Sequence, residues 1–170
     1  MEQLYQIAEK KDTSDLPEFL VREGQALVPM RAHHILGCFC GYGRTKYPAS
    51  LLPKIAERMQ RNANLEIRIV AGLDDICYSC PICINNRCLG AGGKMFSSDM
   101  EKDHDVLRRL RLVSGAVLPA RGLFRMVAEN IPHVADICAD NRVDDNGSLF
   151  TTCSPTSGHY EETLAQGFWE

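Results

Sequence analysis

The sequence predicts an α+β fold: a mainly helical single domain with one short sheet and a cysteine-rich metal loop. Three observations lead to this prediction. Several segments repeat apolar residues at helical spacing, one segment alternates apolar and charged residues, and four cysteines fall within twelve residues. A chain of 170 residues is long enough to enclose a real core as one domain.

The chain divides into two parts at its beginning. Residues 1–26 repeat apolar positions at helical spacing and are predicted to form an N-terminal helical extension. Residues 27–170 are predicted to form the domain that holds the metal. That domain opens with a segment containing the double histidine His33-His34, which leads into a glycine-rich turn.

Three amphipathic helices are expected in the domain, at residues 50–62, from Ser98 onward and at residues 119–130. Residues 65–70 alternate apolar and charged side chains, which predicts a half-buried strand. The cysteine run follows this strand directly, so the metal loop would hang from a strand end. Residues 140–170 are polar and lack periodicity, and an irregular C-terminal tail is expected there.

The net charge and composition limit which classes of partner and which cellular compartment are expected for the protein. The net charge of −3 provides no general attraction to nucleic acid or to an anionic membrane, and no run of 18 apolar residues is present. The first residues lack the pattern of a secretory signal. A cytoplasmic protein is therefore expected, in which eight cysteines favour metal or redox chemistry over disulfides. A disulfide framework in a secreted protein is the alternative.

The cysteine run is the most informative feature of the chain. Cys77, Cys80, Cys83 and Cys88 are separated by two, two and four residues, so their thiolates can converge on one metal centre. Sulfur ligands select zinc or iron–sulfur clusters. Structural zinc usually takes two separated cysteine pairs, whereas consecutive cysteines at this spacing resemble the start of a bacterial ferredoxin run. A [4Fe–4S] cluster is the expected cofactor, with zinc and unmetallated thiols as alternatives.

A remote cysteine completes the ligand set in the ferredoxin pattern. Cys38 and Cys40 are the natural remote candidates in this chain, because both lie just after the double histidine. The run itself departs from that pattern in its last gap, and its proline follows Cys80 rather than the last cysteine. The spacing alone therefore leaves the remaining ligand open.

A small family of bacterial and archaeal proteins, domain of unknown function 1284, is similar to three stretches of the chain. These are His33-His34-Ile35-Leu36 with Cys38 close behind, Asp74-Asp75-Ile76-Cys77, and Cys80-Pro81 with Cys88. The resemblance covers residues 27–115 and implies an iron–sulfur protein with four cysteine ligands. They would match Cys77, Cys80, Cys88 and one cysteine after the double histidine.

The chain departs from the family pattern at two positions. Gly37 occupies the place of the family's cysteine, with Cys38 one residue later, and Cys83 is an additional thiol. The expected ligands of the cluster are therefore drawn from five cysteines. They are Cys38, Cys77, Cys80, Cys83 and Cys88.

Polar residues near the run have expected roles of their own. At most one of His33 and His34 would point at the metal, and the expected arrangement is that one bonds locally and the other is exposed. Metal ligation or proton transfer by either histidine is the alternative. Arg31 is expected to be a solvated surface residue. Asp74 and Asp75 are expected to cap a turn by accepting backbone N–H groups.

A second short stretch, residues 136–138, repeats the Asp-Ile-Cys of residues 75–77. The repeat is interpreted as a half-lost metal loop. Its cysteine, Cys138, and the later Cys153 are expected to be dispensable for the cluster.

Two classes of function follow from a cluster. The first is electron transfer or redox sensing with a partner protein, in which every iron has a protein ligand. The second is a small cluster-dependent enzyme with lyase or sulfur-transfer chemistry on a small molecule at an open iron. A structural zinc protein is a further alternative, and it needs no redox chemistry.

Overall fold

The computed structural model describes residues 27–41, 51–79, 83–84, 87–88, 96–138 and 158–167. The expected extension at residues 1–26 lies outside the described residues, as do Cys80 and Cys153. The elements in chain order are β1 (Leu27–Arg31), α2 (His34–Gly41), α3 (Leu51–Arg61), β2 (Glu66–Val70), α4 (Asp75–Ser79), β3 (Cys83–Ile84), β4 (Arg87–Cys88), α5 (Phe96–Arg109), β5 (Val117–Pro119), α6 (Ala120–Asn130), α7 (Ala135–Cys138) and α8 (His159–Gln166).

A small mixed sheet of three strands has the order β1-β2-β5. β1 and β2 run parallel, with Arg31 opposite Val70, and β5 runs antiparallel to β2. Because β1 and β2 are parallel, the residues that follow them emerge at the same edge of the sheet. Beyond the one sheet that was expected, β3 and β4 form a separate antiparallel pair.

The strand β2 shows why this sheet forms. Ile67 and Ile69 are completely buried, whereas Glu66 and Arg68 on the opposite face are exposed. This alternation confirms the predicted half-buried strand, since successive side chains of a strand point to opposite faces. The backbone carbonyl of Ile69 also accepts the N–H of Gly115, which brings the turn before β5 onto β2.

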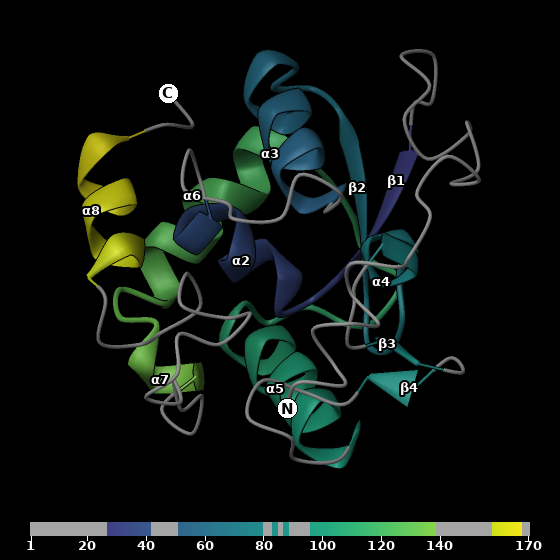
Figure 1. Ribbon diagram of the computed structural model, residues 1–170. Helices are drawn as coiled ribbons and strands as arrows, with labels where there is room; N and C mark the ends of the chain where they lie inside the picture. Colours follow the sequence, from purple (N-terminus) through teal and green to yellow (C-terminus); the bar gives the residue numbers. More distant parts are fainter. Residues whose placement is uncertain are drawn as a thin grey trace, which may run out of the picture.

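The helices build the core beside the sheet, and α2 lies among α3, α6 and α8 (Figure 1). Phe39 of α2 packs edge-on against Phe124 of α6, with ring centroids 5.3 Å apart. The same ring lies 5.3 Å from Tyr160 of α8 in a tilted arrangement. Three helices distant in sequence are thus joined by aromatic contacts, which add specific geometry to the burial of apolar area.

The amphipathic segments expected from the sequence are helices in the structure. α3 and α6 confirm the expected helices at residues 50–62 and 119–130, and α5 begins two residues before Ser98. The expectation of an irregular tail is wrong for residues 159–166, which form α8. The polar sequence conceals this helix because Tyr160 and Thr163 are its only fully buried side chains among the described positions.

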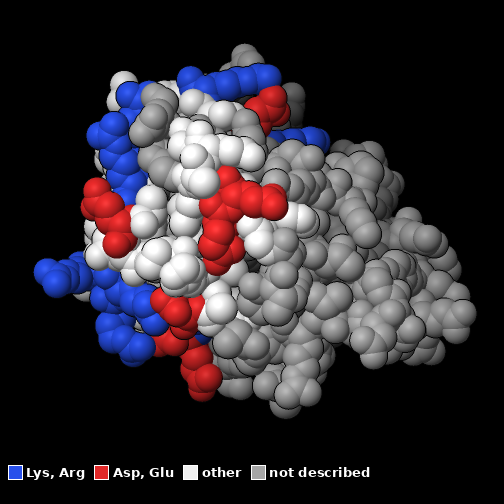
Figure 2. Space-filling model, turned by 90° about the vertical axis from the view of Figure 1, so that its left-hand side faces the viewer, with Lys and Arg blue, Asp and Glu red and all other residues white. Residues whose placement is uncertain are grey.

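Charged residues of both signs are interspersed on the described part of the face that carries α8 (Figure 2). The described part of this face therefore has no broad patch of charge of a single sign. Among the described residues, none of the helices has the length and apolar character needed to cross a membrane.

Candidate metal centre

Polar side chains gather where the two parallel strands end. His33 and His34 follow β1, while Asp74 follows β2 and directly precedes α4. The carboxyl ends of parallel strands are a common place for binding sites, because the chain leaves the sheet there in loops and helix starts. The parallel pairing therefore joins the double histidine to the beginning of the cysteine run, 40 residues apart in the sequence.

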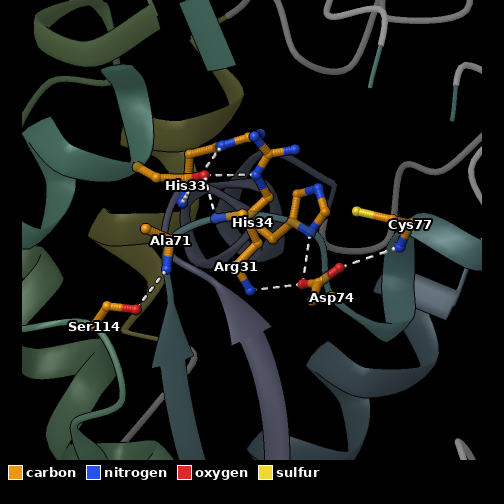
Figure 3. A network of polar contacts seen from close by, with 9 residues as sticks. Arg31, His33, His34, Ala71, Asp74, Cys77 and Ser114 are labelled. Atoms are coloured by element: carbon orange, nitrogen blue, oxygen red, sulfur yellow. Dashed lines mark hydrogen bonds and ion pairs between the residues drawn. The ribbon is translucent and has the colours of Figure 1, made fainter. Parts of the chain in front are cut away.

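His34, Asp74 and Cys77 form the core of this site (Figure 3). One potential ligand atom from each residue lies within 4.8 Å of the other two. The Nδ1 atom of His34 is 2.8 Å from Oδ2 of Asp74, and the Cys77 side chain points toward the His34 ring. An imidazole, a carboxylate and a thiol in this arrangement have the chemistry to hold zinc or iron.

Asp74 organises the three residues. Its Oδ1 accepts the backbone N–H of Cys77 at 3.1 Å, and its Oδ2 accepts the backbone N–H of Arg31 at 2.6 Å. Burial would raise the pKa of this carboxyl, but the charge of His34 and the hydrogen bonds together lower it. The expectation that Asp74 caps a turn is confirmed, and the same carboxylate also links β1, α2 and α4.

Cys77 is 3% exposed, and the pKa of its thiol is raised, first by burial and then by the nearby charge of Asp74. A thiol with a raised pKa is a poor nucleophile, because the thiolate is the reactive form. Metal binding, in contrast, removes the proton as the bond forms. Burial and the neighbouring carboxylate therefore disfavour a free thiolate at Cys77.

A second buried carboxylate, Asp103 of α5, lies beside the first. Its Oδ2 is 2.7 Å from Nε of Arg31 and accepts the N–H of Gly72 at 3.1 Å. Its Oδ1 is 2.8 Å from Nδ1 of His33 and accepts the backbone N–H of that residue at 3.1 Å. Asp103 thus ties the end of β1 and the end of β2 to α5.

The expectation that Arg31 is a solvated surface residue is wrong. Its side chain is completely buried, as is that of Asp103. Arg31 is the last residue of β1, and α5 covers that strand end, so the guanidinium meets a carboxylate instead of water. From sequence alone, an arginine at the end of an apolar strand is expected at the surface. Its burial became apparent only from the contact with α5.

The expectation for the double histidine is also wrong in one respect. Neither ring is exposed in the way that was expected, since the side chains of His33 and His34 are only 18% and 16% accessible. Each ring places Nδ1 on a different buried carboxylate, and the two rings meet edge-on with centroids 4.9 Å apart. Burial lowers the pKa of His33 against the opposing effect of Asp103.

Cys38, the expected ligand from α2, lies deeper than His34. It is 1% exposed and belongs to the apolar core. Burial and then the charge of Asp74 raise the pKa of its thiol. A side chain at the preceding position, Gly37, would instead meet Leu52 of α3, since a Cβ there lies 2.9 Å from its Cδ2 atom.

The later cysteines of the run lie on the small hairpin. Cys83 is the register partner of Cys88 across β3 and β4, and α4 contacts β3. The register therefore sets the backbones of two expected ligands opposite each other, on an element that contacts the helix of Cys77.

Asp103 is the residue of the site that sequence reasoning missed. The signal was present in the pattern of α5, where Val106, Leu107 and Leu110 form the buried face. Asp103 precedes Val106 by three residues and Leu107 by four, so a helix places it on the same face as these two residues. An aspartate on the apolar side of an amphipathic helix needs a buried partner, and here the partner is Arg31.

The fold is that of a mainly helical α+β domain, as the sequence predicted. Within that class, the chain belongs to the family DUF1284, described as a protein of unknown function, whose model matches residues 44–145. This match confirms the resemblance seen in the sequence and contains the whole cysteine run and Asp103, while the double histidine precedes it. Comparisons with curated proteins and with solved structures gave no match.

Proposed function

We propose that the protein is an iron–sulfur protein that carries one [4Fe–4S] cluster beside the carboxyl ends of β1 and β2 and serves in electron transfer or redox sensing. The observation that carries this proposal is the position of Cys77. The first thiol of the cysteine run is buried beside an imidazole and a carboxylate.

The contrast with the other buried cysteines supports a metal at Cys77. Cys38, Cys40 and Cys138 belong to the apolar core, where a cysteine behaves as a small hydrophobic residue. Cys77 lies outside that cluster, and His34 and Asp74 are among its neighbours. A buried carboxylate next to a thiol is electrostatically unfavourable once the thiol ionises, and a bound cation compensates both groups.

The supply of thiols favours a cluster over a single ion. Cys83 and Cys88 are partners on the hairpin that contacts α4, and Cys80 lies between Cys77 and that hairpin in the sequence. Four thiols within twelve residues satisfy the preference of iron–sulfur clusters for cysteine ligands. A reducing cytoplasm is the compartment that keeps such thiols available, and it is the location that we propose.

The role follows from how the irons are coordinated. A cluster with a protein ligand on every iron has no open position, and electron exchange with a partner protein is then its simplest function. An open iron would instead bind a small molecule as a Lewis acid, which is the enzymatic alternative. Titration of the oxidised cluster with cyanide, small thiols or carboxylates separates the two, since only an open iron changes its electronic spectrum without cluster loss.

Metal analysis tests the proposal itself. Protein purified without oxygen is expected to be brown and to contain iron together with acid-labile sulfide. Incubation of the metal-free protein with ferrous iron and sulfide should restore the same absorption. A colourless protein that holds one zinc ion per chain, and that takes up no sulfide on reconstitution, would overturn the proposal.

Structural zinc is the second candidate, and the mixed donors of His34, Asp74 and Cys77 favour it. Zinc accepts nitrogen, oxygen and sulfur ligands in a tetrahedral site. The same elemental analysis decides between the two metals.

A further inference from the structure

We propose that His34 is the ligand that α2 contributes to the metal centre, bound through its Nε2 atom in place of Cys38, while Asp74 holds the imidazole ring in the binding orientation. This inference rests on the proposed metal centre and names a ligand that is not a cysteine.

The hydrogen bond between His34 and Asp74 decides which ring nitrogen is available. Both oxygens of Asp74 already accept backbone N–H groups, from Cys77 at Oδ1 and from Arg31 at Oδ2. The carboxylate therefore acts as an acceptor toward the ring as well, which puts the imidazole hydrogen on Nδ1. A neutral imidazole with hydrogen on Nδ1 has its lone pair on Nε2, the arrangement in which carboxylate-supported histidines bind metals.

The ring of His34 lies close to the thiol of Cys77. His34 is the first residue of α2 and Cys77 lies in α4, and Figure 3 shows the Cys77 side chain directed toward the His34 ring. One ligand atom from each of His34, Asp74 and Cys77 lies within 4.8 Å of the other two, so the imidazole and the thiol are close enough to bind the same metal centre.

Cys38 is less well placed than His34 although it lies on the same side of the helix. Residues four apart share a helix face, but the second lies about 6 Å further along the axis. That step takes Cys38 into the apolar core, and its sulfur does not belong to the group formed by the ligand atoms of His34, Asp74 and Cys77. The helix therefore presents an imidazole at the site and keeps its thiol in the core.

The exchange of a thiolate for an imidazole has a chemical consequence. Imidazole is neutral and thiolate is negative, so the centre carries one negative charge fewer. Histidine ligation raises the reduction potential of iron–sulfur centres for this reason. Substitution of His34 by cysteine should restore the charge and lower the potential.

Protein labelled with ¹⁵N-histidine tests the ligand directly. The full chain is loaded with iron and sulfide without oxygen, reduced, and studied by pulsed electron paramagnetic resonance. We expect a strong ¹⁵N coupling to the cluster in the wild-type protein. The His34→Cys variant should keep wild-type amounts of iron and sulfide, lose the coupling and show a lower reduction potential. The matched variant His104→Cys changes an exposed histidine of α5 and should keep the coupling.

The outcomes separate this inference from the proposed function. A wild-type cluster without ¹⁵N coupling, or a coupling that persists in His34→Cys, overturns the role of His34 and leaves the cluster intact. A second sample receives Co²⁺ alone. Coupling of ¹⁵N to Co²⁺ in a protein that takes up no sulfide supports His34 and overturns the cluster. A protein that binds neither iron with sulfide nor Co²⁺ overturns both the cluster and the role of His34. The wild-type measurement needs no variant, so a folding defect in His34→Cys does not spoil the test.

Discussion

The Nε atom of Arg31 lies 2.7 Å from Oδ2 of Asp103, and both side chains are completely inaccessible to solvent although 72 residues separate them. This ion pair holds the end of β1 against α5 immediately beside the candidate metal centre. It also orients His33, whose backbone and ring both bond to the same carboxylate. The support of the site is therefore a buried network of charges contributed by distant parts of the chain.

Asp103→Ala should destabilise the protein by about 3–5 kcal/mol, because it removes the buried carboxylate that forms an ion pair with the buried guanidinium of Arg31. Urea unfolding followed by circular dichroism measures the change. Asp105→Ala on the same helix is the matched control, since its ion pair with Arg108 is exposed and is expected to contribute less than about 1 kcal/mol. Equal effects of the two substitutions would contradict the importance of the buried pair.

Asp74→Asn should weaken metal binding by about 10–100-fold without abolishing it, because the carboxylate orients a ligand and need not itself be one. Competition with a chromophoric chelator gives the affinity for Co²⁺. Asp75→Asn changes the neighbouring carboxylate, which lies outside the group formed by His34, Asp74 and Cys77, and should leave the affinity unchanged. An unaltered affinity in Asp74→Asn would show that this carboxylate does not support the site.

Cys77→Ser should abolish retention of iron and sulfide, whereas Cys138→Ser should retain both. Cys77 lies beside His34 and Asp74, while Cys138 is buried in the apolar core at the end of α7. Iron and acid-labile sulfide per chain, determined after anaerobic purification, measure the difference. Loss of iron in Cys138→Ser would instead show that the second Asp-Ile-Cys stretch is a working part of the centre.

Removal of the metal should lower the stability of the whole domain, since the centre joins the segments that follow β1 and β2. A ligand present at one hundred times its dissociation constant stabilises the native state by about 2.7 kcal/mol. Thermal unfolding of the loaded and metal-free protein measures the shift. The Cys77→Ser variant should unfold at the same temperature with and without added metal, and a shift of wild-type size in that variant would contradict the assigned site.

Tyr160→Phe should cost about 1–3 kcal/mol, because the Tyr160 hydroxyl donates to the carbonyl of Ile131 at 2.7 Å in a buried position. Its loss leaves that carbonyl without the hydroxyl donor. Gln166→Ala, at the exposed end of α8, is the control and should change the free energy of unfolding by less than about 0.5 kcal/mol. Identical stabilities for the two variants would show that the hydrogen bond does not anchor α8.

Local patterns predicted much of the fold correctly. The periodicity of residues 50–62 and 119–130 is visible in any window of a few turns, because one face of each helix is apolar and the other is charged. α8 was not predicted, because only Tyr160 and Thr163 are buried among its residues and two positions give little periodicity in a polar segment. The hairpin of β3 and β4 consists of two-residue strands, which are too short for any alternation to appear.

The sequence by itself determined the class of the fold, the family, and the presence of a cysteine run suited to a metal. These properties depend on residue type and spacing along the chain, and the amino-acid sequence contains both in full. It also showed that Asp74 would cap the start of the run, because that contact spans only three residues.

Only the tertiary structure decided which groups accompany Cys77. The parallel pairing of β1 with β2 brings His34 to Asp74, and the packing of α5 on the strand end buries Arg31 against Asp103. Such contacts join residues 40 and 72 positions apart, and no local pattern specifies them. They exist because a buried charge is stable only beside a partner, and the partner comes from whichever element the fold places there.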